Sequence, residues 1–122
     1  MGNLSASVFE MSKRVVPGAV IVGNLVFTSG MTGGPGDVET QIKNTLSRLK
    51  ATLESAGTSF ENVIKATVYL ADLSDRERYL NKIWRETFPQ NPPARTCVQV
   101  GLGPGTAVEI EMVAVIPEKG KE

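Results

Sequence analysis

The sequence contains no histidine. Histidine is the usual general base near neutral pH and the commonest ligand of protein-bound zinc. Its absence excludes nucleophilic systems in which histidine activates serine or cysteine, and it excludes the zinc site of the nucleoside deaminases. Any chemistry must therefore use arginine, lysine, carboxylates, hydroxyls, the thiol, backbone groups or water.

Cysteine, net charge and long apolar runs are scarce as well. A single cysteine cannot form an intramolecular disulfide, so nothing in the sequence indicates an oxidising compartment. The 13 basic and 13 acidic residues cancel, whereas nucleic acids and anionic membranes attract a clustered basic excess. No run approaches the roughly 18 to 20 consecutive apolar residues that cross a bilayer. We therefore expect a cytoplasmic protein that binds neither nucleic acid nor membrane.

The length of 122 residues suits a single domain with one core. We expect that domain to span residues 1–122. Its ends, residues 1–12 and 117–122, are polar and irregular, and we expect both to be loosely ordered. The first of them has room for a short edge strand.

Two segments carry the periodicity of helices. Apolar residues recur every three or four positions from Val38 onward, which predicts a helix that Asp37 caps and Gly57 ends. A second helix is predicted to begin at Ser74, which stands at capping-box spacing from Glu77. Both helices are amphipathic, so each should cover a sheet with one side.

Strands are predicted before, between and after the helices. The Gly23-Asn24 pair is a hairpin turn signal that should join strands over 19–22 and 25–29. Further strands are predicted over 63–70, 95–100 and 107–116. The order β-β-α-β-α-β-β predicts an α+β fold, with a mostly antiparallel sheet and both helices on one face.

One arginine and two acids stand out. Arg95 follows the stiff Pro92-Pro93 pair at the start of a strand, so its guanidinium can be held to bind a carboxylate through two parallel hydrogen bonds. Glu109 and Glu111 share a strand face with valines, where a carboxylate normally needs a partner, a ligand or a shifted pKa. Arg95 is one candidate partner. This face is too apolar to be exposed to water and too charged for a simple core. Burial between subunits would account for both properties, so we predict a closed homo-oligomer.

Four blocks of sequence occur in an order and at a spacing typical of one family. They read GNLVFTSG at 23–30, VIKATVYL at 63–70, NPPARTC at 91–97 and VEIEMVAV at 108–115. With them, residues 13–116 resemble the Rid family, the reactive intermediate deaminases also known as YjgF-like proteins. The resemblance implies a chorismate-mutase-like protomer that assembles into a barrel-shaped homotrimer, with an active-site cleft at each subunit interface.

The resemblance further implies hydrolysis of 2-imino and 2-enamino acids, such as 2-iminobutanoate and 2-aminoacrylate, to 2-oxo acids and ammonia. It implies no cofactor and no metal. An imine hydrolyses in water unaided, so the protein need only orient it and place a water nearby. The alternatives are a protein that binds 2-oxo acids without turnover or acts like a chaperone, an RNA-directed endoribonuclease or translation inhibitor, and an aminomuconate-type deaminase.

The resemblance also assigns roles to individual residues. Arg95 matches the family arginine that binds the substrate carboxylate, and Glu109 matches the glutamate that positions the attacking water. Cys97 matches a cysteine whose neighbourhood contacts the substrate, mainly through backbone groups. The other family positions expected to contact the substrate are Ser29, Gly30 and Asn81.

Two positions depart from the family pattern. Val16 stands where many active members carry a tyrosine, and Met31 stands where many carry a glutamine. We expect both changes to make the cleft more apolar and to alter the substrate preference, without disturbing Arg95 and Glu109.

Overall fold

The computed structural model describes residues 6–8 and 15–118, so the predicted loose ends fall largely outside the described residues. The strands are β1 (Ala6–Val8), β2 (Ala19–Val22), β3 (Leu25–Thr28), β4 (Val63–Leu70), β5 (Ala94–Gln99) and β6 (Val108–Val115). The helices are α1 (Val38–Ser55) and α2 (Asn81–Thr87), with the short helical turns η1 (Phe60–Asn62) before β4 and η2 (Arg76–Leu80) before α2.

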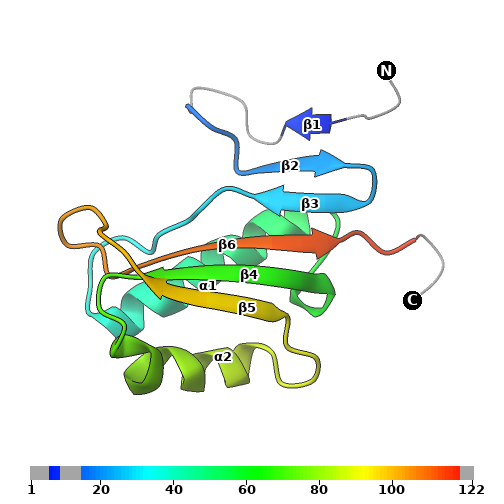
Figure 1. The fold of residues 1–122 in the computed structure, drawn as a ribbon. Coiled ribbons are helices and arrows are strands. Elements are labelled where there is room, and N and C mark those ends of the chain that lie inside the picture. Colours follow the sequence, from blue (N-terminus) through cyan, green and yellow to red (C-terminus); the bar gives the residue numbers. More distant parts are fainter. Residues whose placement is uncertain (1–5, 9–14, 119–122) are drawn as a thin grey trace.

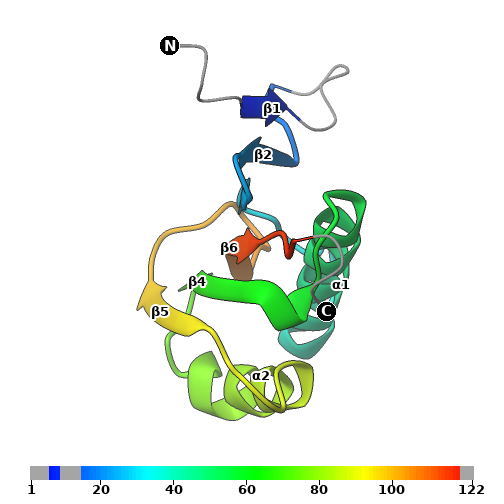
Figure 2. The same ribbon diagram turned by 90° about the vertical axis from the view of Figure 1, so that its right-hand side faces the viewer.

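The strands form one sheet, and both helices cover the same face of it (Figures 1 and 2). Across the sheet the order is β1-β2-β3-β6-β4-β5. β2 and β3 form the predicted hairpin, in which Gly23 takes a φ of 60° that favours glycine. β6 lies antiparallel between β3 and β4, while β5 runs parallel to β4. The predicted α+β class and mostly antiparallel sheet are confirmed, and β1 supplies the expected short edge strand.

The predicted first helix is confirmed at both ends. The Thr40 N–H donates to Asp37 Oδ1 at 2.8 Å, and this hydrogen bond holds the pKa of Asp37 below its ordinary value. Gly57 follows the last turn with a φ of 96°. The stripe buried against the sheet includes Ile42, Leu46, Leu49 and Leu53. No helix in the described ranges combines the length and apolar character needed to cross a membrane.

The start of the second helix differs from the prediction. The predicted capping box does not form, because the Ser74 N–H donates to Asp72 Oδ1 at 3.0 Å rather than to Glu77, and the Ser74 hydroxyl donates to the same oxygen at 2.7 Å. A side-chain acceptor two residues earlier competes successfully with the helix for these groups. The chain then enters α2 through η2, a wide turn closed by a hydrogen bond from the Asn81 N–H to the Arg76 carbonyl.

The other face of the sheet carries the predicted mixture of charged and apolar side chains. Tyr69 pairs with Glu109 across β4 and β6, and Thr67 pairs with Glu111. Burial and then the charge of Glu111 raise the pKa of Tyr69 above its ordinary value. Phe27 on the same face is 42% exposed, and no described helix covers it.

Candidate functional site

Glu109 lies on the open face of the sheet, against Gly30. A β-carbon on Gly30 would lie 2.2 Å from Glu109 Oε2, so the carboxylate occupies the space that any side chain at position 30 would need. Backbone hydrogen bonds between Met31 and Ile110, at 2.9 and 3.0 Å, hold the two segments together. Gly30 is therefore required for this placement of Glu109.

Ser29 lies beside Gly30, and its hydrogen bonds connect the end of β3 to the segment before β2. Its hydroxyl donates to the Pro17 carbonyl at 2.7 Å, and its N–H donates to the Gly18 carbonyl at 2.9 Å. The hydroxyl oxygen keeps its lone pairs as acceptors. We call Glu109, Gly30 and Ser29 the glutamate half-site.

Arg95 lies at the opposite face, on the edge strand β5. Its Nη2 donates to Asn81 Oδ1 at 2.9 Å, and its Cζ lies 5.2 Å from the centre of the Trp84 ring. Asn81 Nδ2 donates in turn to Glu77 Oε2 at 3.1 Å. Arg95 is thus held by α2 and η2, and Asn81, expected at the cleft, is in direct contact with it.

Cys97 adds backbone groups to the same edge. The Val100 N–H donates to the Leu70 carbonyl at 3.0 Å, so alternation along β5 turns the N–H and carbonyl of Cys97 away from β4. Burial raises the pKa of the Cys97 thiol above its ordinary value, and the positive charge of Arg95 offsets only part of this effect. The thiol is therefore a poor nucleophile, whereas the backbone groups are well placed for a ligand. We call Arg95, Asn81 and the Cys97 backbone the arginine half-site.

The two half-sites do not meet within one chain. Arg95 pairs with Ala66, which pairs with the buried Met112, so Arg95 belongs to the helix-covered face. Glu109 pairs with Tyr69 on the open face. The partner of Arg95 is therefore Asn81 rather than either acid of β6. A site that contains both Arg95 and Glu109 requires two chains.

The expectation that Met31 makes the cleft more apolar is wrong, whereas its effect on substrate preference stays a prediction. The residue is 5% exposed, and the Thr52 hydroxyl lies 3.7 Å from its sulfur, between the sheet and α1. The bridge between Met31 and Ile110 is shifted by one residue from the register of β3 on β6, so position 31 falls opposite a core-facing residue and turns toward the core. Met31 therefore changes the packing of the core rather than the polarity of a cleft. Val16 is 56% exposed, and its effect stays a prediction.

Trp84 and Glu77 have contacts that the sequence pattern did not reveal. The helical spacing of Trp84 accounts for its burial, but not for the guanidinium stacked on its ring. These contacts could have been predicted from the spacing of Glu77, Asn81 and Trp84. Intervals of four and three residues place side chains on one face of a helix.

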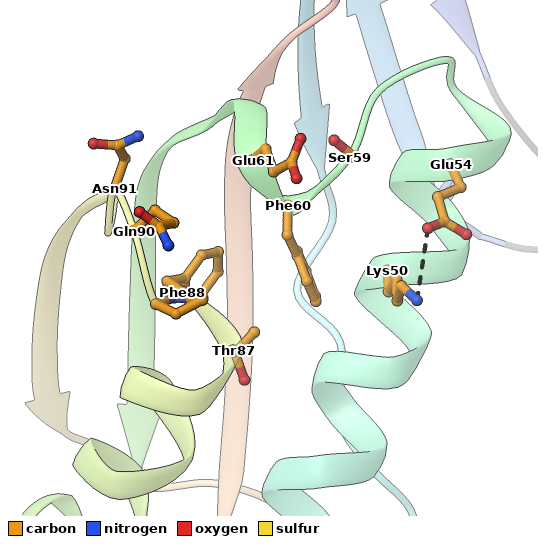
Figure 3. A pocket seen from close by; sticks show the side chains of 10 residues that line it. Lys50, Glu54, Ser59, Phe60, Glu61, Thr87, Phe88, Gln90 and Asn91 are labelled. Atoms are coloured by element: carbon orange, nitrogen blue, oxygen red, sulfur yellow. Dashed lines mark ion pairs between the residues drawn. The ribbon is translucent and has the colours of Figure 1, made fainter.

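A separate cavity of about 330 Å³ lies at the end of α2, between α1 and η1 (Figure 3). Phe60 and Phe88 line it, with ring centres 5.2 Å apart, and Lys50 and Glu54 form an ion pair at its rim. Neither half-site contributes to this cavity. Among the described residues, no cluster of three or more acidic or cysteine side chains is arranged to hold a metal ion.

Comparison with known proteins agrees with this architecture. A RutC family protein from Pyrococcus abyssi is 38% identical over 105 residues, which cover 79% of this chain and 82% of the relative. The 2-iminobutanoate/2-iminopropanoate deaminase of Rattus norvegicus is 39% identical over 106 residues, covering 80% of this chain and 77% of the relative. The crystal structure of a Rid family protein from Yersinia pestis matches with a TM-score of 0.85 at 25% identity, over 92% of this chain and 100% of that one.

The fold is the α+β protomer expected for YjgF-like proteins, and a YjgF family structure from Neisseria meningitidis matches it with a TM-score of 0.83 at 30% identity, over 94% of this chain and 98% of that one. The family model described as Endoribonuclease L-PSP matches residues 8–116. The chain belongs to this family, the Rid or YjgF-like proteins.

Proposed function

We propose that this protein is a 2-iminobutanoate/2-iminopropanoate deaminase, which hydrolyses 2-imino and 2-enamino acids to 2-oxo acids and ammonia. We propose further that it acts as a closed homotrimer with its clefts between chains. The observation that carries the proposal is the division of Arg95 and Glu109 between opposite faces of one sheet. Each chain would then give its arginine half-site to one neighbour and its glutamate half-site to the other.

Arg95 binds the substrate carboxylate. One Nη2 N–H is used by Asn81, and the remaining N–H groups of the fork suffice for two parallel hydrogen bonds to a carboxylate. The outward N–H and carbonyl of Cys97 lie two residues along the same strand, where they can orient the imine beside the bound carboxylate. A fixed carboxylate and a fixed imine together set the direction from which water attacks.

Glu109 supplies the base. Its carboxylate holds a water molecule and accepts a proton from it as the oxygen bonds to C2 of the imine. Glu109 returns that proton to the nitrogen of the resulting carbinolamine, and as the C–N bond breaks and ammonia leaves, the carboxylate takes the proton of the C2 hydroxyl, so that C2 becomes the carbonyl of the 2-oxo acid. A 2-enamino acid enters the same route after tautomerising to the imine.

Burial between chains also accounts for the composition of the open face. Phe27 and Val98, which are 42% and 37% exposed, lie on it together with half-buried Tyr69 and Glu111. An apolar surface interrupted by a few polar groups is typical of an interface. Trimer formation would remove these side chains from water while bringing the half-sites of neighbouring chains together.

The test is a reaction in which threonine dehydratase releases 2-iminobutanoate. Added wild-type protein should accelerate the appearance of 2-oxobutanoate and ammonia in proportion to its concentration. An unchanged rate would contradict the proposal. If 2-oxobutanoate bound without any such acceleration, the non-catalytic ligand-binding alternative would be favoured instead.

Gly30→Ala should reduce this activity with little effect on the fold. The added methyl would lie 2.2 Å from Glu109 Oε2, and the end of a flexible side chain yields more easily than the backbone. A displacement of the base by about 1 Å is expected to lower kcat roughly 10- to 100-fold. Steady-state kinetics and thermal melting check this result.

The matched control is Gly101→Ala, since no atom lies within 4 Å of a β-carbon at position 101. It should retain wild-type kinetics. Equal activity of the two variants would contradict the proposed contact between Gly30 and Glu109.

A further inference from the structure

Three side chains of η2 and α2 determine the surroundings of the Arg95 guanidinium. Asn81 accepts from Arg95 Nη2 at 2.9 Å and donates to Glu77 Oε2 at 3.1 Å. A guanidinium can only donate and a carboxylate can only accept, so one orientation of the amide between them satisfies both. Glu77 therefore keeps the Asn81 oxygen directed at Arg95.

The wide turn η2 brings these residues to β5. Its closing hydrogen bond joins the Asn81 N–H to the Arg76 carbonyl, which adds one residue to the ordinary helical repeat. Glu77, Asn81 and Trp84 then follow at intervals of four and three residues and share one face of the helix. Their contacts with Arg95 identify that face as the one turned toward the edge strand.

Trp84 is a rigid support on the same face. It is 6% exposed, and its ring packs on that of Phe88 with the centres 4.9 Å apart. Its position is therefore set by the core rather than by Arg95. A cation within about 6 Å of an aromatic ring centre is attracted to the face of the ring, and the Arg95 Cζ lies at 5.2 Å.

We propose that Trp84 is a positioning residue for substrate binding. Its ring and the Asn81 amide, braced by Glu77, hold the Arg95 guanidinium so that the remaining N–H groups receive the carboxylate of a 2-imino or 2-oxo acid. The proposal rests on the proposed function, because it concerns the ligand of Arg95. A carboxylate that binds Arg95 changes the charge beside the indole, so occupancy of the site changes the fluorescence of Trp84.

The experiment is a fluorescence titration of the wild-type protein with 2-oxobutanoate, the stable product. The chain contains one tryptophan, so the emission reports on Trp84 alone. We expect a saturable change whose Kd agrees with calorimetry. In Trp84→Phe, which keeps a weaker aromatic face, the calorimetric Kd and KM should rise about threefold, and in Trp84→Leu about 10- to 30-fold. The value of kcat should stay within about twofold, since the base is untouched.

Phe88→Leu is the matched control for loss of packing. Phe88 is buried to the same extent and contacts the Trp84 ring, but Arg95 lies over Trp84 rather than over Phe88. This variant should lower the Tm while leaving Kd and KM unchanged. A role of Trp84 in packing alone predicts that Phe88→Leu and Trp84→Leu shift Kd equally.

The outcomes separate this proposal from the proposed function. If Trp84→Phe and Trp84→Leu bind 2-oxobutanoate with the wild-type Kd, or if Phe88→Leu weakens binding as much as Trp84→Leu, the positioning role is overturned. The deaminase proposal then stands on wild-type turnover of 2-iminobutanoate. A wild-type protein that neither binds 2-oxobutanoate nor hydrolyses the imine overturns both.

Discussion

Arg95→Ala is expected to lower kcat/KM for 2-iminobutanoate by roughly 30- to 5,000-fold. Truncating one partner of a hydrogen-bonded charge pair costs about 2–5 kcal/mol, because the other charge loses its counterpart while still desolvated. In Arg95→Ala, the charge left without a counterpart is the substrate carboxylate. The neighbouring Asn81 and Trp84 carry no positive charge that could replace Arg95. Most of the loss should appear in KM, with a further loss in kcat because the imine is no longer oriented.

Two further variants separate charge from geometry at Arg95. Arg95→Lys keeps the charge but lacks the planar fork and the stacking on Trp84, so it should recover only part of the lost activity. Arg85→Ala, an exposed arginine of α2, removes the same charge elsewhere and should retain wild-type kinetics. Wild-type kcat/KM in Arg95→Ala, with the assembly intact, would remove Arg95 from the mechanism.

Glu109→Gln is expected to lower kcat by about 10²- to 10⁴-fold, the usual contribution of a general base. Glutamine has nearly the same shape as glutamate, so it should still fit against Gly30, but it cannot accept the proton of the attacking water. KM should change little, since the carboxylate is bound by Arg95. Single-turnover kinetics with enzyme in excess would locate the loss in the chemical step.

Glu111→Gln is the matched control for this variant. Glu111 lies on the same strand and the same face, two residues further on, but it pairs with Thr67, and the three atoms nearest a β-carbon at position 30 all belong to Glu109. Any effect should fall on assembly, measured by sedimentation, and assembled Glu111→Gln should turn over at the wild-type rate. Equal losses of kcat in the Glu109 and Glu111 variants would attribute the effect to the negative charge of the open face. They would contradict the role of Glu109 as the general base.

Local patterns predicted most of the elements. The apolar stripe that begins at Val38, with Asp37 before it and Gly57 after it, is enough to specify α1, because caps and periodicity act within a few residues. The alternation in β6 likewise separates Glu109 from its buried neighbours. These features depend on side chains that are close in sequence.

Pairings between distant segments could not be predicted in this way. Whether Arg95 and Glu109 share a face depends on the register of β5 on β4 and of β6 on β4. The residue pattern of one strand carries no information on its register with another strand. Met31 was misplaced for the same reason, since its direction follows from the bridge to Ile110, far along the chain. The capping box predicted at Ser74 is missing because Asp72, rather than Glu77, accepts the Ser74 N–H.

The central claim is that each active site combines Arg95 of one chain with Glu109 of another. It is tested most directly by mixing equal amounts of Arg95→Ala and Glu109→Gln chains, unfolding them together and refolding them as mixed trimers. Random assembly places an intact arginine beside an intact glutamate at about one quarter of the sites, so we expect about one quarter of wild-type activity from two nearly inactive variants. Mixed trimers with no more activity than the separate variants would contradict the account.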